Sequence, residues 1–432
     1  MRKKRFIILG GLAGVCILAV LLYQLPPIHD RLSWRLDNLR AQVKYAFNPP
    51  EAVVFKPQDP VAEVVRATMQ AMTPSPTPTL PTDATAVDGT AAPTLTITPV
   101  PTPLPDRVAL TGIRYQDQHG LWNYCAPANL AMALSYWGWE GDRMTTGAVL
   151  KPFAKDKNVM PYEMADYVTS QTQLKVALRY AGTPELVKSF LAAGYPVLVE
   201  KGAFMRDTTN KISWMGHYQV ITGYDEAKSI FIAQDSYYTK DYPVPYDEFI
   251  SGWRAFNNVY LIIYPAEKEQ EVMNLLGADA DEAANNQHAA DHASDEIYAT
   301  SGLDQFFAWF DRGSSLVLLQ DYSGAAQAYD QAFAIYATIA EDQRPWRIMW
   351  YETGPYYAYY FVGRYYDVLN LADTTINTAN EPYLEESFTW RARAKIALGD
   401  SSGAIEDWQK ALEYHPGFAP AVSELQALNA GG

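Results

Sequence analysis

The stretch WNYCAPANL (residues 122–130) places Cys125 directly before a predicted helix. Leu130 and Leu134 follow the cysteine at helical spacing, and Pro127 suits the first turn of a helix. A thiol at a helix N-terminus lies near the positive end of the helix dipole and near free backbone N–H groups. Both favour the thiolate, the form that attacks a carbonyl carbon, and the N–H groups can also stabilise an oxyanion. Cys125 is therefore a candidate nucleophile.

The second cysteine of the chain, Cys16, lies within an apolar N-terminal run. These positions make a disulfide between the two cysteines unexpected, and no Cys/His cluster has metal-ligand spacing. We therefore expect no disulfide framework, no metal and no cofactor. The alternative interpretation of Cys125 is a small buried side chain without chemistry.

A general base and a carboxylate that orients it are predicted on two strands after the helix. His217 begins the strand-like run HYQVITGY (residues 217–224), and Asp235 closes the run SIFIAQD (residues 229–235). If these runs form a hairpin centred on Glu226, the two side chains are directly paired, and such partners lie about 5 Å apart. A thiolate nucleophile works best beside a base that an acceptor orients. The pattern therefore predicts a Cys–His–Asp triad.

Residues 107–265 as a whole have an α+β pattern, because a helical stretch comes first and strand-like runs follow. The expected strands are YPVLVEKG (195–202), HYQVITGY (217–224), SIFIAQD (229–235) and NVYLIIYP (258–265).

The strings NYCAPANLAMALSYWG, YPVLVE, GHYQVITGYD and QDSY occur in this order within residues 111–265. Together they resemble the bacteriocin-processing, double-glycine-leader peptidase-like branch of the papain-like cysteine peptidases. The resemblance implies a papain-like fold that hydrolyses a peptide or protein substrate. It implies that Cys125 is the nucleophile, His217 the base and Asp235 the orienting residue. One departure is Ala126, where the family usually has glycine, and alanine leaves the backbone donor in place.

The family also uses a glutamine a few residues before the cysteine as a side-chain oxyanion donor. In RYQDQHGLWNYC, both Gln116 and Gln118 precede the nucleophile. The spacing of Gln118 is closer to the family pattern, whereas the Tyr-Gln pair favours Gln116. We choose Gln118 as the oxyanion donor, with Gln116 as the alternative. His119 is a further pocket candidate that we expect to be a loop residue.

The N-terminus predicts a membrane anchor within residues 1–28. Basic residues at 2–5 precede an uncharged apolar run at 6–23, which is about long enough to cross a hydrocarbon core as a helix. The basic flank is expected to stay in the cytoplasm, which puts the bulk of the chain outside a single-pass cell-membrane anchor. The alternative is a cleaved signal peptide, although no small-x-small cleavage site follows the run.

Residues 29–72 are predicted to form a juxtamembrane stalk, and residues 73–106 a Thr/Pro-rich linker that cannot pack. The stalk contains apolar residues at helical spacing with basic residues between them. These positions are Leu32, Leu36, Leu39 and Val43. They predict either an amphipathic helix on an anionic membrane surface or a solvated stalk helix.

Residues 266–300 are acidic, small and non-periodic, and they predict a second linker. His288 and His292 lie there at i, i+4, but we expect solvated side chains rather than metal ligands. Residues 301–432 then predict an all-α tetratricopeptide-like repeat region. The matched positions of three copies are Ala325 and Ala332, Val368 and Thr375, and Ala404 and Ala411.

Such helix pairs predict a docking surface for a protein partner, with a plain helical bundle as the alternative. The net charge of −15 argues against nucleic acid, because phosphate binding needs clustered Lys and Arg. The combined expectation is a membrane-anchored, extracytoplasmic cysteine peptidase. The alternatives are a catalytically inactive binding or scaffold protein that acts through its repeats, and a transglutaminase-type acyl transferase with the same triad logic.

The predicted topology can be tested on intact cells. Protease added outside should cut within residues 73–106 and release a soluble fragment, because the basic flank keeps only the N-terminus inside. An immunoblot of the medium detects the fragment, and a cytoplasmic marker protein should stay whole. Complete protection of the chain would contradict the topology.

Overall fold

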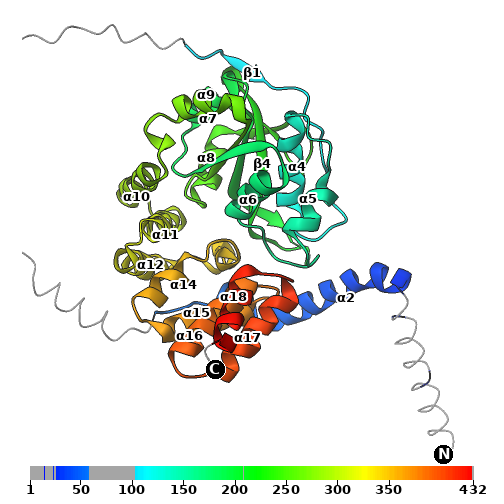
Figure 1. Cartoon of the computed structure of the whole chain (residues 1–432), viewed down its shortest axis with the longest axis vertical. Coiled ribbons are helices and arrows are strands. Elements are labelled where there is room, and N and C mark those ends of the chain that lie inside the picture. The colour runs from blue at the N-terminus through cyan, green and yellow to red at the C-terminus, as the bar shows by residue number, and fades with distance from the viewer. Residues whose placement is uncertain (1–13, 15–22, 24–25, 58–102, 208, 431–432) are drawn as a thin grey trace, which may run out of the picture.

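The computed structural model describes residues 14, 23, 26–57, 103–207 and 209–430 (Figure 1). A sheet with helices on both faces forms one part of the molecule, and a group of helices forms the other.

Within the described residues, one antiparallel sheet has the strand order β2-β7-β3-β4-β5-β6, and β1 pairs with β4. The strands are β1 (Arg107–Ala109), β2 (Leu174–Arg179), β3 (Val197–Arg206), β4 (Ile212–Asp225), β5 (Ile230–Gln234), β6 (Tyr242–Pro245) and β7 (Tyr260–Pro265). The prediction of a helix followed by an antiparallel sheet is confirmed. The four expected strands correspond to β3, β4, β5 and β7, whereas β1, β2 and β6 were not expected.

Both faces of the sheet are apolar because successive strand residues point to opposite sides. In β3, Leu198 packs on the face covered by α4 and α6, while Val197 and Val199 pack on the face covered by α7, α8 and α9. The helices around the sheet are α4 (Cys125–Tyr136), α5 (Arg143–Leu150), α6 (Pro161–Gln171), α7 (Pro184–Ala192), α8 (Tyr246–Arg254) and α9 (Glu269–Leu276). The sheet is therefore a buried layer, and packing against its two faces sets the positions of the helices.

The prediction of a linker at residues 266–300 is wrong. The segment forms η3 (Ala266–Lys268), α9, η4 (Gly277–Ala280) and α10 (Glu282–Ala299). Small side chains such as Ala289 and Ala293 are buried in α10, and Asn285 bonds both backbone groups of Tyr180. Small residues allow α10 to pack closely on α11, so the composition that looked like a linker serves a helix contact.

The C-terminal part consists of helices that pack on their neighbours in chain order. They are α11 (Gly302–Leu318), α12 (Tyr322–Tyr336), η5 (Glu341–Gln343), α13 (Ile348–Tyr351), α14 (Gly354–Phe361), α15 (Tyr365–Thr378), α16 (Glu385–Ala397), α17 (Ser401–Tyr414) and α18 (Ala419–Ala430). Ala325, Val368 and Ala404, three of the matched repeat positions, are fully buried in α12, α15 and α17. The tetratricopeptide architecture itself stays a prediction.

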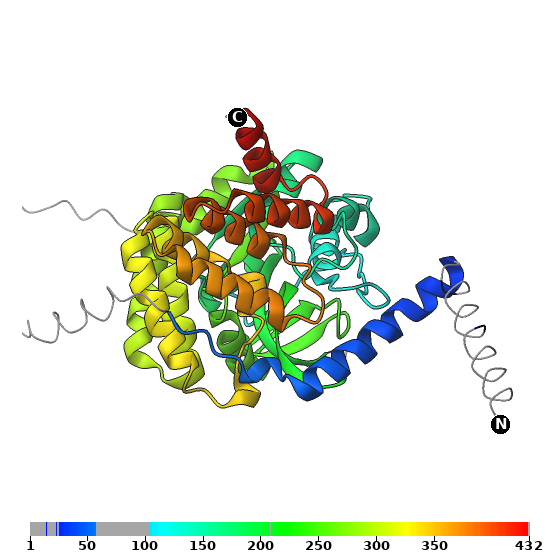
Figure 2. The same cartoon turned by 90° about the horizontal axis from the view of Figure 1, so that it is seen from below.

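The N-terminal segment packs against this helical region. It comprises α2 (Pro26–Phe47) and η1 (Pro50–Ala52). Lys44 Nζ donates to the backbone oxygens of Asn377 and Ala379. Asp37 of α2 also pairs with Lys155 in the loop after α5, outside the helical region. Figure 2 shows α2 extending from the side of the body of the molecule.

The apolar stripe predicted in the stalk lies on the outer face of α2, since Leu39 and Val43 are about half exposed. Among the residues that the structure describes, no helix is both long and apolar enough to cross a membrane. The predicted span at 6–23 lies outside the described residues, apart from Gly14 and Tyr23, as does the predicted linker up to residue 102.

The sheet and the helical region share a hydrophobic core cluster at β4, in addition to the two clusters on the faces of the sheet. Trp214 of β4 stacks between Phe256 and Phe307, and both pairs of ring centroids are 5.8 Å apart. Arg347 reaches back from the helical region to Ser213, the backbone oxygen of Trp214 and Asp207. The two parts are therefore expected to unfold together.

Phe307→Ala should lower the free energy of unfolding by about 3–5 kcal/mol, because it removes a buried ring from this shared core. Urea unfolding of the purified chain, followed by tryptophan fluorescence and by circular dichroism, measures the change. Tyr298→Ala is the control, since Tyr298 is 90% exposed on α10. Two separate transitions, with Phe307→Ala shifting only one, would contradict a shared core.

Candidate active site

Cys125 is the first residue of α4, as its position in the sequence predicts. The N-cap residue Tyr124 makes no side-chain hydrogen bond to the helix, so its side chain does not occupy the first-turn N–H groups. Asn123, two residues before Cys125, has a φ of 45°, a left-handed conformation that asparagine tolerates better than most residues. The chain therefore turns sharply before the thiol, which stays partly accessible.

A buried lysine holds this turn in place. Lys151 Nζ donates to the backbone oxygens of Trp122, Asn123 and Asp156, and Asn123 Nδ2 donates to the same Asp156 oxygen. Burial lowers the pKa of Lys151 to about 8. The ammonium also acts on Cys125 as a nearby positive charge. Lys151 thus holds the turn that carries the Cys125 thiol and favours the ionised form of that thiol.

His217 and Asp235 are in contact and fully buried. His217 Nε2 lies 3.0 Å from Asp235 Oδ1, which leaves ring nitrogen Nδ1 for Cys125. Asp235 also accepts hydrogen bonds from Gln219 Nε2 at 2.5 Å and from the backbone N–H groups of Tyr237 and Tyr238. Its carboxylate is therefore held in one orientation from several sides.

The predicted direct pairing of His217 with Asp235 is wrong in register. Val220 pairs with Gln234, and a bulge lies between Ile221 and Gly223. If this register continues by one residue, Asp235 lies opposite Gln219 of β4. His217 is two residues before Gln219 and points to the same face of the sheet. Asp225 pairs with Ile230, so the turn at residues 226–229 is centred between residues 227 and 228 and not on residue 226. The contact between His217 and Asp235 is therefore diagonal.

The electrostatics of the three residues favour a thiolate–imidazolium pair. Burial alone disfavours the ionised thiol, but the hydrogen bond and charge of His217 lower the pKa of Cys125 below its ordinary value. Burial alone also disfavours a charged ring, but the charge and hydrogen bond of Asp235 raise the pKa of His217 to about 10. Although burial opposes it, the His217 charge lowers the pKa of Asp235.

Gln118 lies at this site, and Gln116 does not. Gln118 Oε1 accepts a hydrogen bond from Ser236 Oγ at 2.7 Å, and Ser236 in turn accepts from Asn129 Nδ2. With its oxygen so bound, the Gln118 amide can direct its N–H groups to the cavity that it lines together with Cys125. Gln116 Oε1 instead accepts from the backbone N–H of Arg143, away from the cavity.

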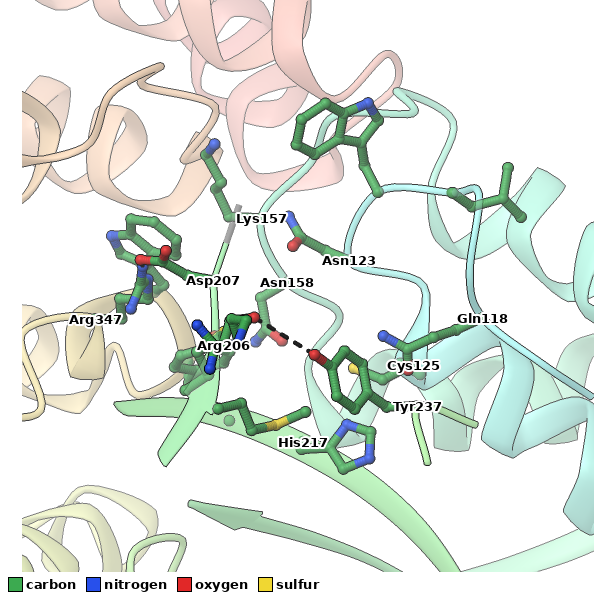
Figure 3. A pocket seen from close by; sticks show the side chains of 18 of the residues that line it. Gln118, Asn123, Cys125, Lys157, Asn158, Arg206, Asp207, His217, Tyr237 and Arg347 are labelled. Atoms are coloured by element: carbon green, nitrogen blue, oxygen red, sulfur yellow. Dashed lines mark hydrogen bonds and ion pairs between the residues drawn. The ribbon is translucent and has the colours of Figure 1, made fainter. Parts of the chain in front are cut away.

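A cavity of about 260 Å³ opens beside the thiol (Figure 3). Gln118, Cys125, His217 and Tyr237 gather at one end, whereas Lys157, Asp207 and Arg347 lie toward the other. Segments distant in sequence line it: residues 37–45 of α2, 118–126, 157–159, 205–207, 215–217, 347–351 and 380–381. The helical region and α2 therefore form walls of the cavity that contains the thiol.

His119 is a loop residue that lines the same cavity, and its Nδ1 lies 2.7 Å from Asp117 Oδ1. Sequence reasoning missed Lys151, Asn129, Gln219 and Ser236. Gln219 could have been predicted from the sequence, because strand alternation puts it on the same face as His217. No motif around Lys151 could have predicted its role, because that role depends on contacts with residues 122–123 that form only on folding.

Comparison with known protein families adds a further observation. Residues 110–262 match the Peptidase_C39 like family. The match covers α4 to α8, strands β2 to β6 and the first half of β7, and it excludes α2, β1 and the helical region. It indicates a peptidase of the cysteine type for this C39-like segment.

A comparison with solved structures gives a candidate C39-like peptidase from Bacillus anthracis, with 17% identity and a TM-score of 0.31. The similarity covers 36% of this chain and 96% of that chain. A comparison with curated proteins finds no match.

Alkylation of Cys125 tests the thiolate of the C39-like segment. Iodoacetamide should react with it at pH values below the usual thiol pKa of about 8.5, because His217 lowers the pKa of Cys125. In His217→Ala the pH–rate profile should move to higher pH, since that pKa then rises. Mass spectrometry of the Cys125 peptide follows the rate, with His288→Ala on the exposed surface of α10 as the control. Identical profiles for wild type and His217→Ala would contradict the ion pair.

Proposed function

We propose that this chain is a cysteine peptidase that hydrolyses peptide bonds through Cys125, His217 and Asp235. One observation carries the proposal: Asp235 holds His217 through Nε2, so that Nδ1 serves the thiol at the start of α4, beside an open cavity. Nucleophile, base and orienting group are thus connected in the order that such catalysis needs.

Acylation follows from this arrangement. The Cys125 thiolate attacks the carbonyl carbon of the scissile bond, and the carbonyl oxygen becomes an oxyanion. The backbone N–H of Cys125 and the Gln118 amide can donate to that oxygen. His217 then gives its Nδ1 proton to the leaving amine, the C–N bond breaks, and a thioester remains on Cys125.

Deacylation uses the same groups in reverse. His217, now neutral, takes a proton from water while the water oxygen attacks the thioester carbonyl. The tetrahedral intermediate collapses, the C–S bond breaks, and the product carboxylic acid leaves with the thiolate restored. Asp235 stays ionised throughout and keeps the ring in one tautomer, because its low pKa makes it a poor proton acceptor.

The cavity walls support a role for the helical region in substrate binding. Trp350, Tyr351 and Glu381 come from that region, and they line the same cavity as Cys125. A peptide that reaches the thiol would pass between these residues and the loop at 118–126. The tetratricopeptide-like helices would then bind substrate near the scissile bond, in addition to any partner on their outer surface.

The location of the activity follows from the N-terminal sequence. We propose a single-pass anchor at 6–23 with the peptidase outside the cytoplasm, supported by the basic flank at 2–5. Substrates would then be extracytoplasmic peptides or proteins.

The order of severity among variants tests the mechanism. Cys125→Ala should abolish turnover, and His217→Ala should be nearly as severe, because it removes both activation and protonation of the leaving group. Asp235→Asn should be milder, since an amide still orients the ring. Gln118→Glu keeps an oxygen for Ser236 but removes the N–H donor, and should lower kcat by about 10²–10³.

Cleavage of a peptide library by the purified chain, with products identified by mass spectrometry, gives the rates. Gln116→Ala is the matched control and should cleave like wild type, because Gln116 lies outside the cavity. Turnover by Cys125→Ala equal to wild type would remove the peptidase proposal. Cavity-dependent peptide binding without any cleavage would favour the scaffold alternative.

A further inference from the structure

Three side chains that the proposed peptidase chemistry does not use meet between the C39-like segment and the helical region. Asp156 follows α5, Glu385 begins α16, and His415 directly follows α17. One ligand atom from each lies within 4.8 Å of the other two. Two carboxylates and an imidazole from three separate elements thus converge on one point.

Burial makes this cluster costly without a ligand. Asp156 is 3% exposed and Glu385 is 2% exposed. His415 Nδ1 lies 2.8 Å from Glu385 Oε1, but Glu385 Oε2 is buried and accepts no hydrogen bond from the described residues. A buried carboxylate oxygen without a donor costs free energy that a bound cation would recover.

The charges around the cluster also favour a cation. The carboxyl groups of Asp156, Glu163 and Glu386 lie close enough to Glu385 to oppose its ionisation. The positive charges that act on Asp156 come from Lys151 and Lys157. The Lys151 ammonium, however, bonds the backbone oxygen of Asp156 and not its carboxylate. The carboxylates of the cluster therefore lack a direct cationic partner among these lysines.

We propose that Asp156, Glu385 and His415 bind one divalent transition-metal ion, of which Zn²⁺ fits best. Zn²⁺ accepts imidazole nitrogen together with carboxylate oxygen, and four-coordinate sites with three protein ligands leave one position for water. Ca²⁺ and Mg²⁺ prefer oxygen ligands alone, so the imidazole argues against both.

The ion would be a positioning element for the nucleophile. It would tie the backbone around Asp156 to α16 and α17. The Asp156 carbonyl already accepts hydrogen bonds from Asn123 and Lys151, which hold the turn before Cys125. The metal would thereby fix the helical wall of the cavity relative to the thiol.

Metal binding is best measured in the Cys125→Ala background, because the Cys125–His217 pair could itself bind Zn²⁺. Equilibrium dialysis of the purified full-length protein should give one tightly bound Zn²⁺ per chain. Adding His415→Ala should weaken binding by about 10–100-fold or more, since losing a ligand costs no less than losing its supporting partner. Zn²⁺ should raise the Tm of the parent but not of this variant.

His288→Ala is the matched control, because His288 also contacts a carboxylate, Asp279, but on an exposed surface. It should leave Zn²⁺ affinity unchanged. If His415→Ala fails to fold by circular dichroism, Glu385→Gln replaces it and should weaken binding to the same extent. Absence of bound Zn²⁺, equal affinity in these variants, or binding of Ca²⁺ in preference to Zn²⁺ would each overturn the proposal.

Discussion

The hydrogen bond between His217 Nε2 and Asp235 Oδ1 is the interaction on which the site depends. Two buried ionisable groups would be costly if either lacked partners. Asp235 meets this constraint with Gln219 and two backbone N–H groups in addition to His217. Since this leaves Nδ1 as the ring nitrogen free for the thiol, the imidazole has only one useful orientation.

A second constraint comes from the core that the sheet and the helices share. Trp214 lies in β4, the strand that also carries His217, and it stacks on Phe307 of the helical region. Movement of that region would therefore disturb the strand bearing the proposed base. The same packing brings residues 347–351 and 380–381 to the cavity, so the elements that carry the candidate site and the walls around them belong to one folded body.

Local patterns explain which parts of the site could be predicted. Cys125 before a helical stretch, and His217 and Asp235 on strand-like runs, all follow from periodicities of a few residues. The predicted register between the two strands was wrong. A single bulge near residue 222 and a turn at 226–229 change which residues pair, but they leave no trace in the alternation of apolar and polar residues. The prediction of a linker at residues 266–300 was wrong for a related reason. A polar, Ala-rich segment becomes helical when α11 offers a surface to pack against.

The sequence by itself therefore determined the identity of the proposed nucleophile, base and orienting carboxylate, together with the helix and strands that carry them. It also singled out Gln118 and Gln116, but only the fold separated them, by anchoring one to Ser236 beside the thiol and the other to Arg143. Tertiary structure alone determined the contacts of Lys151, the walls of the cavity and the Asp156–Glu385–His415 cluster. Their members are distant along the chain, and no local spacing can report contacts that exist only after folding.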